Sequence, residues 1–396
     1  MWGSILSRAG DTDYRPVMAG VIIYMAAPLG MTLIPLIVGA AAADLGFSNS
    51  EVGYLASADL IGLACISVTA ALWIRRLSWH LIATISICLI VLGNLFSVLA
   101  ENFTVLCFAR FITEVGSGGL YALALVSLGE TKTPDRFFSF GIGLTIALSV
   151  GVFLWFPALI ELHGIDVIFV FHGAVALAIT PVLFWLPKYA SSEPMQKGAA
   201  DAVNLKPLLV CFFAFACFTL AEGGVWSYVE RIGAGAGLAT EYVGEVLAWT
   251  QVASFFAALL ASWLSIRLGR SIPVCGGMLA FMLSFYLLQM PDETSYLIGA
   301  CLSQFAWIFV LPYLMLMCVE LDRSGRYYVL ITATKMGGFA LGPAIIATLM
   351  VTGEATQSVD AGLGLQDFVI VSWIGGIFVL ISLVLFLPLA IRLDKG

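Results

Sequence analysis

Long apolar stretches alternate with short polar connections along the whole chain. A helix that crosses a membrane needs about 20 mainly apolar residues, because roughly 30 Å of hydrocarbon is crossed at about 1.5 Å per residue. By this measure the sequence predicts twelve spanning segments: 17–42, 51–73, 81–99, 103–128, 138–160, 165–186, 208–230, 241–264, 272–290, 294–319, 327–351 and 368–389. The runs are too long and continuous for the strands of a membrane barrel, so an all-α polytopic membrane protein is predicted.

Composition agrees with this pattern and excludes several soluble classes of protein. Of the 396 residues, 61% are hydrophobic and 11% are charged, and the mean hydropathy is +1.02. A soluble fold with so few polar residues would be unable to cover its surface. The net charge of −7 and the pI of about 5.0 argue against nucleic acid as a partner. The polar N-terminus lacks the apolar core of a signal peptide, so the first span is expected to remain in the membrane.

Lysine and arginine residues gather in alternate connections between the predicted spans. If the N-terminus lies inside, Arg231 is the one basic residue outside, and Arg110 and Lys335 lie within spans. The other basic residues all fall inside: Arg8, Arg15, Arg75, Arg76, Lys132, Arg136, Lys188, Lys197, Lys206, Arg267, Arg270, Arg323, Arg326, Arg392 and Lys395. Because cytoplasmic loops carry the excess of positive charge, both termini are predicted in the cytoplasm, with the chain in a bacterial inner membrane.

The longest polar connection, 187–206, divides the twelve spans into six and six. At an offset of 191 residues several short matches keep one register: Arg15-Pro16 with Lys206-Pro207, Val52-Gly53 with Val243-Gly244, Arg76-Leu77 with Arg267-Leu268, and Gly151 with Gly342. A fixed offset of this kind indicates a duplicated unit. The sequence therefore predicts two pseudo-symmetric six-helix bundles, 1–186 and 207–396, joined by a cytoplasmic linker at 187–206.

Two six-helix halves with both termini and the linker inside resemble the major facilitator superfamily of secondary transporters, and the resemblance covers the whole chain. In that family the loop after the second helix reads roughly G-x-L-a-D-R-x-G-R-R. The second-half copy, at 262–270, has Ile266 in place of the acid, and the first-half copy is weaker. The resemblance implies gating residues in these loops: Arg76, Arg267, Gly269 and Arg270.

The fourth predicted span also carries a family pattern. Residues 110–119 resemble the family's R-x-x-x-G-x-G-x-G-G run, with Glu114 where a glycine is usual. The glycine-rich run with Gly-Pro that marks the antiporters is missing from the fifth span, whereas a similar run, 338–343, lies in the eleventh. This absence argues against a drug/proton antiporter. The resemblance further implies a monomer that works by alternating access around a site near the midplane.

Ionisable residues within the spans are candidates for function, because each costs about 2.5–3.5 kcal/mol on insertion scales. They are Asp59, Arg110, Glu114, Glu222 and Lys335. Arg110 and Glu114 are four residues apart on one helical face and are expected to pair. Asp59, at a similar depth on a neighbouring helix, is expected to pair with Arg110 as well. If Glu114 takes a proton, Arg110 is freed to hold an anion. The alternative is a static ion pair that holds the helix in place.

The second half offers one acid and one base. Glu222 precedes two glycines that can admit solvent, and it is a candidate for proton carriage or for binding a substrate amine; the alternative is an acid satisfied by neighbouring hydroxyls. Lys335 has no acid three or four residues away on its helix. Resemblance to the family's organic-anion carriers implies that Lys335 contacts a substrate carboxylate, and the alternative is snorkelling to the inner surface.

Other polar and aromatic side chains near these charges are candidates for shaping a substrate site: Tyr121, Trp155, Trp226, Tyr228, Trp249, Gln251, Gln304 and Trp307. Glu114, Glu222 and Asp59 are the candidates for proton coupling. His172 is expected to be a satisfied helix-packing residue. Neither the eight cysteines nor the three histidines show metal-ligand spacing, and there is no Walker-type run. No metal, no cofactor and no direct use of ATP are therefore predicted.

These features favour a secondary active transporter over an enzyme. The predicted function is uptake of a small organic anion or zwitterion by proton symport, with the substrate, protons and the lipid bilayer as partners. The alternative is proton-coupled efflux of amphipathic compounds, which the apolar, tryptophan-rich spans favour and the missing Gly-Pro opposes. A membrane-embedded enzyme or sensor would need a nucleophile constellation, a metal site or a soluble signalling domain, and none is visible in the sequence.

Overall fold

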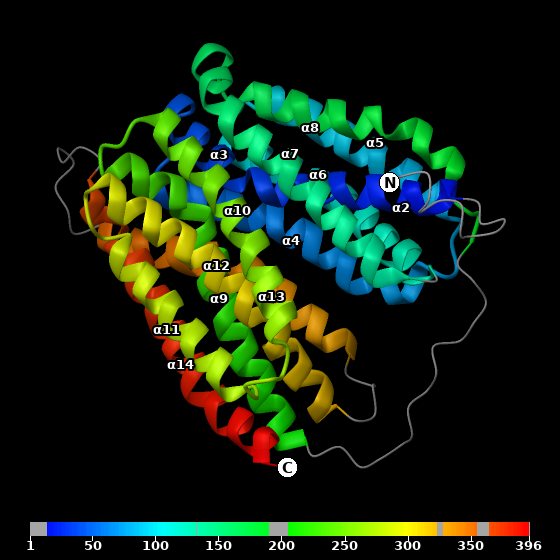
Figure 1. The fold of residues 1–396 in the computed structure, drawn as a ribbon. Helices are drawn as coiled ribbons and strands as arrows, with labels where there is room; N and C mark the ends of the chain where they lie inside the picture. Colours follow the sequence, from blue (N-terminus) through cyan, green and yellow to red (C-terminus); the bar gives the residue numbers. More distant parts are fainter. Residues whose placement is uncertain (1–13, 132, 190–204, 323–327, 355–363, 396) are drawn as a thin grey trace, which may run out of the picture.

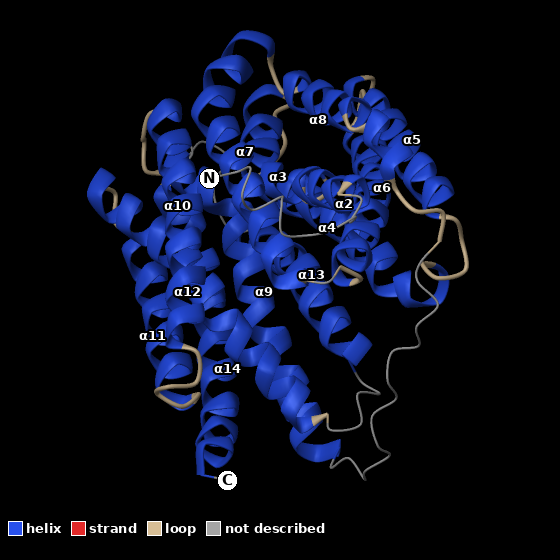
Figure 2. Cartoon of the chain, turned by 45° about the vertical axis from the view of Figure 1, so that its right-hand side comes forward, coloured by secondary structure: helices blue, strands red, loops and turns tan. Residues whose placement is uncertain are grey.

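The computed structural model describes residues 14–131, 133–189, 205–322, 328–354 and 364–395. The described part is helical, apart from one isolated bridge between Arg267 and Gly269 (Figures 1 and 2). Its α-helices are α2 (Arg15–Ala26), α3 (Leu29–Asp44), α4 (Asn49–Trp73), α5 (Trp79–Val98), α6 (Phe103–Gly129), α7 (Pro134–His163), α8 (Asp166–Ala178), α9 (Leu205–Gly235), α10 (Thr240–Leu264), α11 (Ser271–Leu287), α12 (Glu293–Leu321), α13 (Tyr328–Glu354) and α14 (Val369–Lys395). Two short 3₁₀ segments, η1 (Thr180–Trp185) and η2 (Leu365–Phe368), follow α8 and precede α14.

Each predicted span corresponds to a helix or to a pair of consecutive helices. Within the described ranges, 11 helical segments are long and apolar enough to cross a membrane, and α11 is a shorter apolar helix. The all-α membrane fold is therefore confirmed. The largest errors lie at the ends of α9 and α14, which continue to Gly235 and Lys395, beyond the predicted 230 and 389. Hydropathy marks where the hydrocarbon ends, whereas a helix can continue past it into the polar region.

Local sequence explains where several helices begin and break. The Ser48 side chain accepts a bond from the Glu51 amide, and the Glu51 carboxylate accepts one from the Ser48 amide, a capping box that starts α4. Asn102 and Asp292 cap α6 and α12, where their side chains accept bonds from the amides of Val105 and Ser295. The first predicted span is divided into α2 and α3 just before Leu29, because Pro28 lacks the amide hydrogen that a continuous helix requires.

Helices α2 to α8 pack mainly on one another, as do α9 to α14, and we call these the first and second bundles. We call the end of the molecule that holds Arg15, Lys188 and Lys395 the linker end, and the opposite end the far end. In Figure 1 the two bundles meet at the far end and diverge towards the linker end, the first to the right and the second to the bottom. The domain boundaries at 186 and 207 stay a prediction, and residues 190–204 of the predicted linker lie outside the described ranges.

Most of the contact between the bundles is made by α4 with α13, by α7 with α10, and by α3 with α9. Two glycines that the internal repeat pairs, Gly53 and Gly244, both lie in these contacts. A Cβ on Gly53 would meet the Tyr228 hydroxyl and the Ala347 side chain, and one on Gly244 would meet Phe153 backbone and a proline ring. The predicted repeat thus pairs two glycines that each lie at a point of close approach between the bundles.

Candidate functional site

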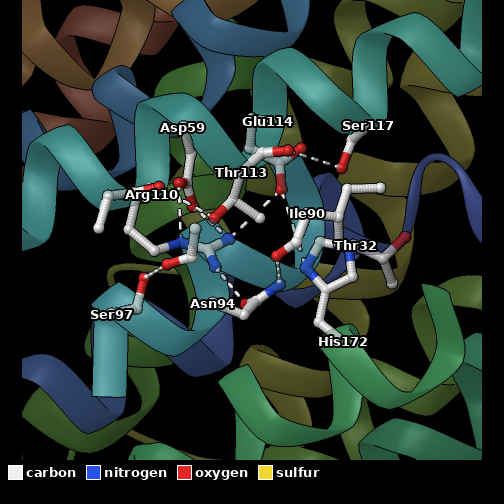
Figure 3. Close-up of polar contacts among 12 residues, drawn as sticks. Thr32, Asp59, Ile90, Asn94, Ser97, Arg110, Thr113, Glu114, Ser117 and His172 are labelled. Atoms are coloured by element: carbon white, nitrogen blue, oxygen red, sulfur yellow. Dashed lines mark hydrogen bonds and ion pairs between the residues drawn. The ribbon is translucent and has the colours of Figure 1, made fainter. Parts of the chain in front are cut away.

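A buried cluster of charged side chains occupies the centre of the first bundle (Figure 3). Arg110 on α6 donates from Nε to Asp59 Oδ1 at 2.9 Å and from Nη2 to Asp59 Oδ2 at 3.3 Å. Nη2 also donates to Glu114 Oε1 at 3.3 Å. The three side chains are at most 1% exposed. Both pairings expected from the sequence are confirmed, and Arg110 is enclosed by its partners instead of facing an open site.

Two residues that the sequence argument missed complete the shell around Arg110. Asn94 on α5 accepts a bond from Nη1 at 3.0 Å through Oδ1, and its amide donates to the Ile90 carbonyl at 2.8 Å. The Phe169 ring on α8 lies 5.2 Å from the guanidinium carbon. Asn94, the one amide side chain in its predicted span, was the available signal for the first residue. Phe169 offered no signal among so many phenylalanines.

His172 of α8 lies beside this cluster, with Nδ1 at 4.0 Å from Glu114 Oε1. The ring is buried, and Nδ1 has no hydrogen bond within the described structure, nor has Glu114 Oε2. The expectation of a satisfied packing histidine is therefore wrong. The Glu114 carboxyl also lies directly against Gly30 of α3, where a side chain would collide with it.

The second bundle holds a separate buried acid. Glu222 on α9 is 1% exposed and accepts a bond from the Gln304 amide of α12 at 2.5 Å. Its other oxygen has no hydrogen bond, and no ion pair joins Glu222 to a basic side chain in the described part of the chain. The partner is thus an amide instead of the hydroxyls suggested as an alternative. An ionised carboxylate without a counter-charge is costly to bury, so binding of a proton to Glu222 would remove that free-energy cost.

A cavity of about 140 Å³ lies between the bundles, on the linker side of their main contacts. Its walls come from both bundles: Pro28, Met31, Leu63, Tyr121, Trp307, Ile308, Leu311, Lys335, Met336 and Phe339. Lys335 is its one charged lining residue, and no hydrogen bond or ion pair is found for it within the described ranges. The cavity therefore offers an ammonium group among aromatic and aliphatic walls.

Both buried acids lie just behind these walls. Gly30, which contacts Glu114, lies between the lining residues Pro28 and Met31 of the first bundle. In the second bundle Gln304, the partner of Glu222, stands one helical turn from Trp307 on α12. A change of protonation at either acid therefore occurs next to the cavity surface.

Trp226 and Tyr228 join the two bundles and do not line the cavity. Trp226 Nε1 donates to the Met31 carbonyl at 3.1 Å, and the Tyr228 hydroxyl donates to the Asn49 carbonyl at 2.8 Å. Both bonds connect α9 to the first bundle and lie in the far half of the molecule. They close the space between the bundles on the side away from the linker end.

The remaining candidates from the sequence lie elsewhere. The Gln251 amide contacts its neighbour Thr250 at 3.3 Å and does not line the central cavity. Trp155 and Trp249 are 74% and 58% exposed on the outside of the bundles, as expected for side chains that face lipid. Of the aromatic and amide candidates, Tyr121 and Trp307 are therefore the two that the structure brings to the cavity with Lys335.

The model of the Major Facilitator Superfamily matches residues 20–343, which is most of the chain and includes parts of both bundles. The chain belongs to this superfamily. Its members are transporters, so the chain carries a transporter fold and general secondary transport is its function. No curated protein matches the sequence.

Solved structures of other superfamily transporters share the fold over nearly the full length. A bacterial homolog of the human lysosomal transporter Spinster, in an inward-facing and unoccupied conformation, has a TM-score of 0.71 at 14% identity and covers 98% of each chain. A mutant of the nucleoside transporter NupG has a TM-score of 0.72 at 14% identity, covering 95% of this chain and 99% of its own. At these identities the likeness shows the fold alone.

The loop of the second bundle that resembles the superfamily's gating motif is held by acids from other helices. Arg270 pairs with Glu320 at the end of α12 and lies 3.5 Å from Asp394 at the end of α14. Asp394 also accepts bonds from the amides of Arg270 and Ser271 at 2.7 and 2.9 Å. These carboxylates supply negative charge to the loop, whose sequence has Ile266 where the family motif has an acid.

The equivalent loop of the first bundle has a weaker version of this network. Arg75 lies 3.7 Å from Glu130 at the end of α6, while Arg76, the predicted gating residue, has an exposed side chain. In the second-bundle loop, Gly269 adopts a φ of +70°, which favours glycine, and Arg267 stacks on Trp263 at 5.6 Å. In the first-bundle loop, the residue that pairs with an acid is therefore Arg75, one position before the predicted Arg76.

Proposed function

We propose that this superfamily member is a proton-coupled symporter for a small organic anion or zwitterion, working by alternating access. The observation that carries the proposal is Lys335, the one charged lining residue of a cavity that both bundles form. A partly buried ammonium with an aromatic surround favours a ligand that brings a carboxylate or another acidic group. Tyr121 and Trp307 would contact the apolar part of that ligand.

Glu222 and the Glu114 cluster support coupling to protons. Each acid is buried behind a wall of the cavity with one oxygen that no described group satisfies, so a proton can neutralise it as the substrate site changes its access. Arg110 would hold the substrate anion only after its bonds to Asp59 and Glu114 loosen. Trp226 and Tyr228 support this cycle as contacts that close the far end.

The positive charge of the loops supports an orientation with the linker end in the cytoplasm of a bacterial inner membrane. Among the basic residues behind this inference, Arg8, Lys132, Lys197, Arg323 and Arg326 lie outside the described ranges. With that orientation, the contacts at the far end would close the cavity from the outside. We further propose that the transporter acts as a monomer.

Proton movement in proteoliposomes tests this function. The reconstituted protein, with a pH-sensitive dye inside, is given organic acids, amino acids, nucleosides and lipophilic cations in turn. Internal acidification on adding an anion or a zwitterion is expected, and Glu222→Gln or Glu114→Gln should abolish it. Glu241→Gln, an exposed residue at the far end, is the matched control. Alkalinisation of acid-loaded vesicles by a lipophilic cation would instead support amphipathic efflux, and silence across the panel would overturn proton coupling.

The substrate charge is tested at Lys335. A charge-assisted hydrogen bond contributes about 1.5–3 kcal/mol, so Lys335→Gln should raise the KM for the anion roughly 10- to 100-fold. Lys188→Gln, at an exposed residue on the linker end, should leave the KM unchanged. An unchanged KM in Lys335→Gln would show that the lysine snorkels to the surface instead of binding substrate.

A further inference from the structure

The buried cluster of the first bundle carries an uncompensated charge. Arg110 contributes one positive charge, and Asp59 and Glu114 contribute two negative charges when both are ionised, which leaves a net charge of −1. All three side chains are almost completely buried. Since a buried charge without a partner is costly, one additional proton would stabilise the cluster.

The geometry restricts where that proton can reside. Asp59 receives two bonds from Arg110, at 2.9 and 3.3 Å, whereas Glu114 receives one, at 3.3 Å. Glu114 Oε2 has no hydrogen bond in the described structure, and the same is true of His172 Nδ1. Figure 3 shows the Glu114 carboxyl and the His172 ring facing each other, with Nδ1 4.0 Å from Oε1. The less tightly held carboxylate therefore faces the unpaired ring nitrogen.

The surroundings of His172 contain few other groups that could take or give a proton. The charged or titratable side chains facing it in the described structure are Glu114 and Arg110 of α6, with Asp59 of α4 behind the guanidinium. From α5 the neutral Asn94 packs against Gly173, next to the histidine. Because Asp59 compensates the charge of Arg110, a positive charge on His172 would face mainly Glu114.

We propose that His172 and Glu114 share the one proton that neutralises this cluster, so that His172 is a further proton-carrying residue of the transporter beside Glu114 and Glu222. In the transfer the O–H bond of the Glu114 acid breaks and an N–H bond forms at His172 Nδ1, with the second ring proton remaining on Nε2. The products are a carboxylate and an imidazolium. The separation of 4.0 Å between Glu114 Oε1 and His172 Nδ1 must shorten to about 3 Å for this step, and a side-chain rotation can produce that change.

This inference rests on the proposed function in taking Glu114 as a proton carrier, but it can be measured without transport. The full chain has three histidines, so a His80→Gln, His163→Gln background leaves His172 as the one imidazole. In ¹⁵N-histidine-labelled protein in nanodiscs, we expect the Nδ1 resonance to move towards that of imidazolium as the pH falls from about 8 to 5. Glu114→Gln should abolish this movement, because the cluster is then neutral without a proton.

Two further variants keep the test decisive. Asp59→Asn also removes one negative charge, so it should abolish the movement too and serves if Glu114→Gln does not fold. Glu222→Gln removes a buried acid from the other bundle and should leave the movement intact. The proposal would be overturned by a His172 resonance that does not respond to pH, or by one that moves in Glu114→Gln and Asp59→Asn as far as it does in the parent. Failure of symport in liposomes would overturn the proposed function and leave this titration unaffected.

Discussion

The bond between Tyr228 and Asn49 gives a quantitative test of how the far end is held closed. Tyr228→Phe removes one hydrogen bond of 2.8 Å that joins the two bundles and leaves the ring in place. A bond of this kind contributes about 1 kcal/mol net, so its loss should lower the population of the far-end-closed state relative to the open state about fivefold. Tyr296→Phe removes a bond of the same length, to Val229, that lies wholly within the second bundle. It should lower stability without changing that ratio.

The ratio can be read from distances between the far ends of the bundles. Spin labels are placed on Glu101→Cys and Glu293→Cys, two exposed positions in different bundles, in a background without the native cysteines. Double electron–electron resonance should show the longer-distance population rising in Tyr228→Phe and not in Tyr296→Phe. If both variants give the parent's distance distribution, the bond does not hold the far end. A raised KM with unchanged distances would assign Tyr228 to substrate binding instead.

Two other variants test the packing and the gating loop. Gly223→Ala should lower the melting temperature and the transport rate, because its Cβ would collide with the Phe339 backbone at a cost of about 1–3 kcal/mol. Gly151→Ala, whose Cβ would have no neighbour within 4 Å, should change neither quantity. Equal effects of the two substitutions would contradict this packing. Arg270→Gln should destabilise the protein by about 1 kcal/mol or less, since its pairs are partly exposed, and 1 M salt should shrink the difference from the parent. A loss that is independent of salt in thermal unfolding would refute an electrostatic role for this loop.

Candidate site residues divide according to whether their partners are near in the sequence. Arg110 and Glu114 pair within one helical face, which the spacing of four residues already indicates. The pairing of Arg110 with Asp59 joins positions 51 residues apart, and the contact with Asn94 depends on how α5 packs against α6. His172 lies in the middle of a mainly apolar span, and no local pattern indicates that its Nδ1 faces Glu114 on another helix.

The sequence by itself determined the membrane-spanning helices and the repeat, because the hydrocarbon requires long apolar helices and a duplicated unit keeps a fixed offset. It also identified the charged residues within the spans, since such charges are too costly to be accidental. Tertiary structure decided the surroundings that each of them has beyond its own helix. Lys335 reaches a cavity, Arg110 is enclosed, and Tyr228 joins the bundles, because the rotation and approach of packed helices depend on contacts between distant segments that no local pattern records.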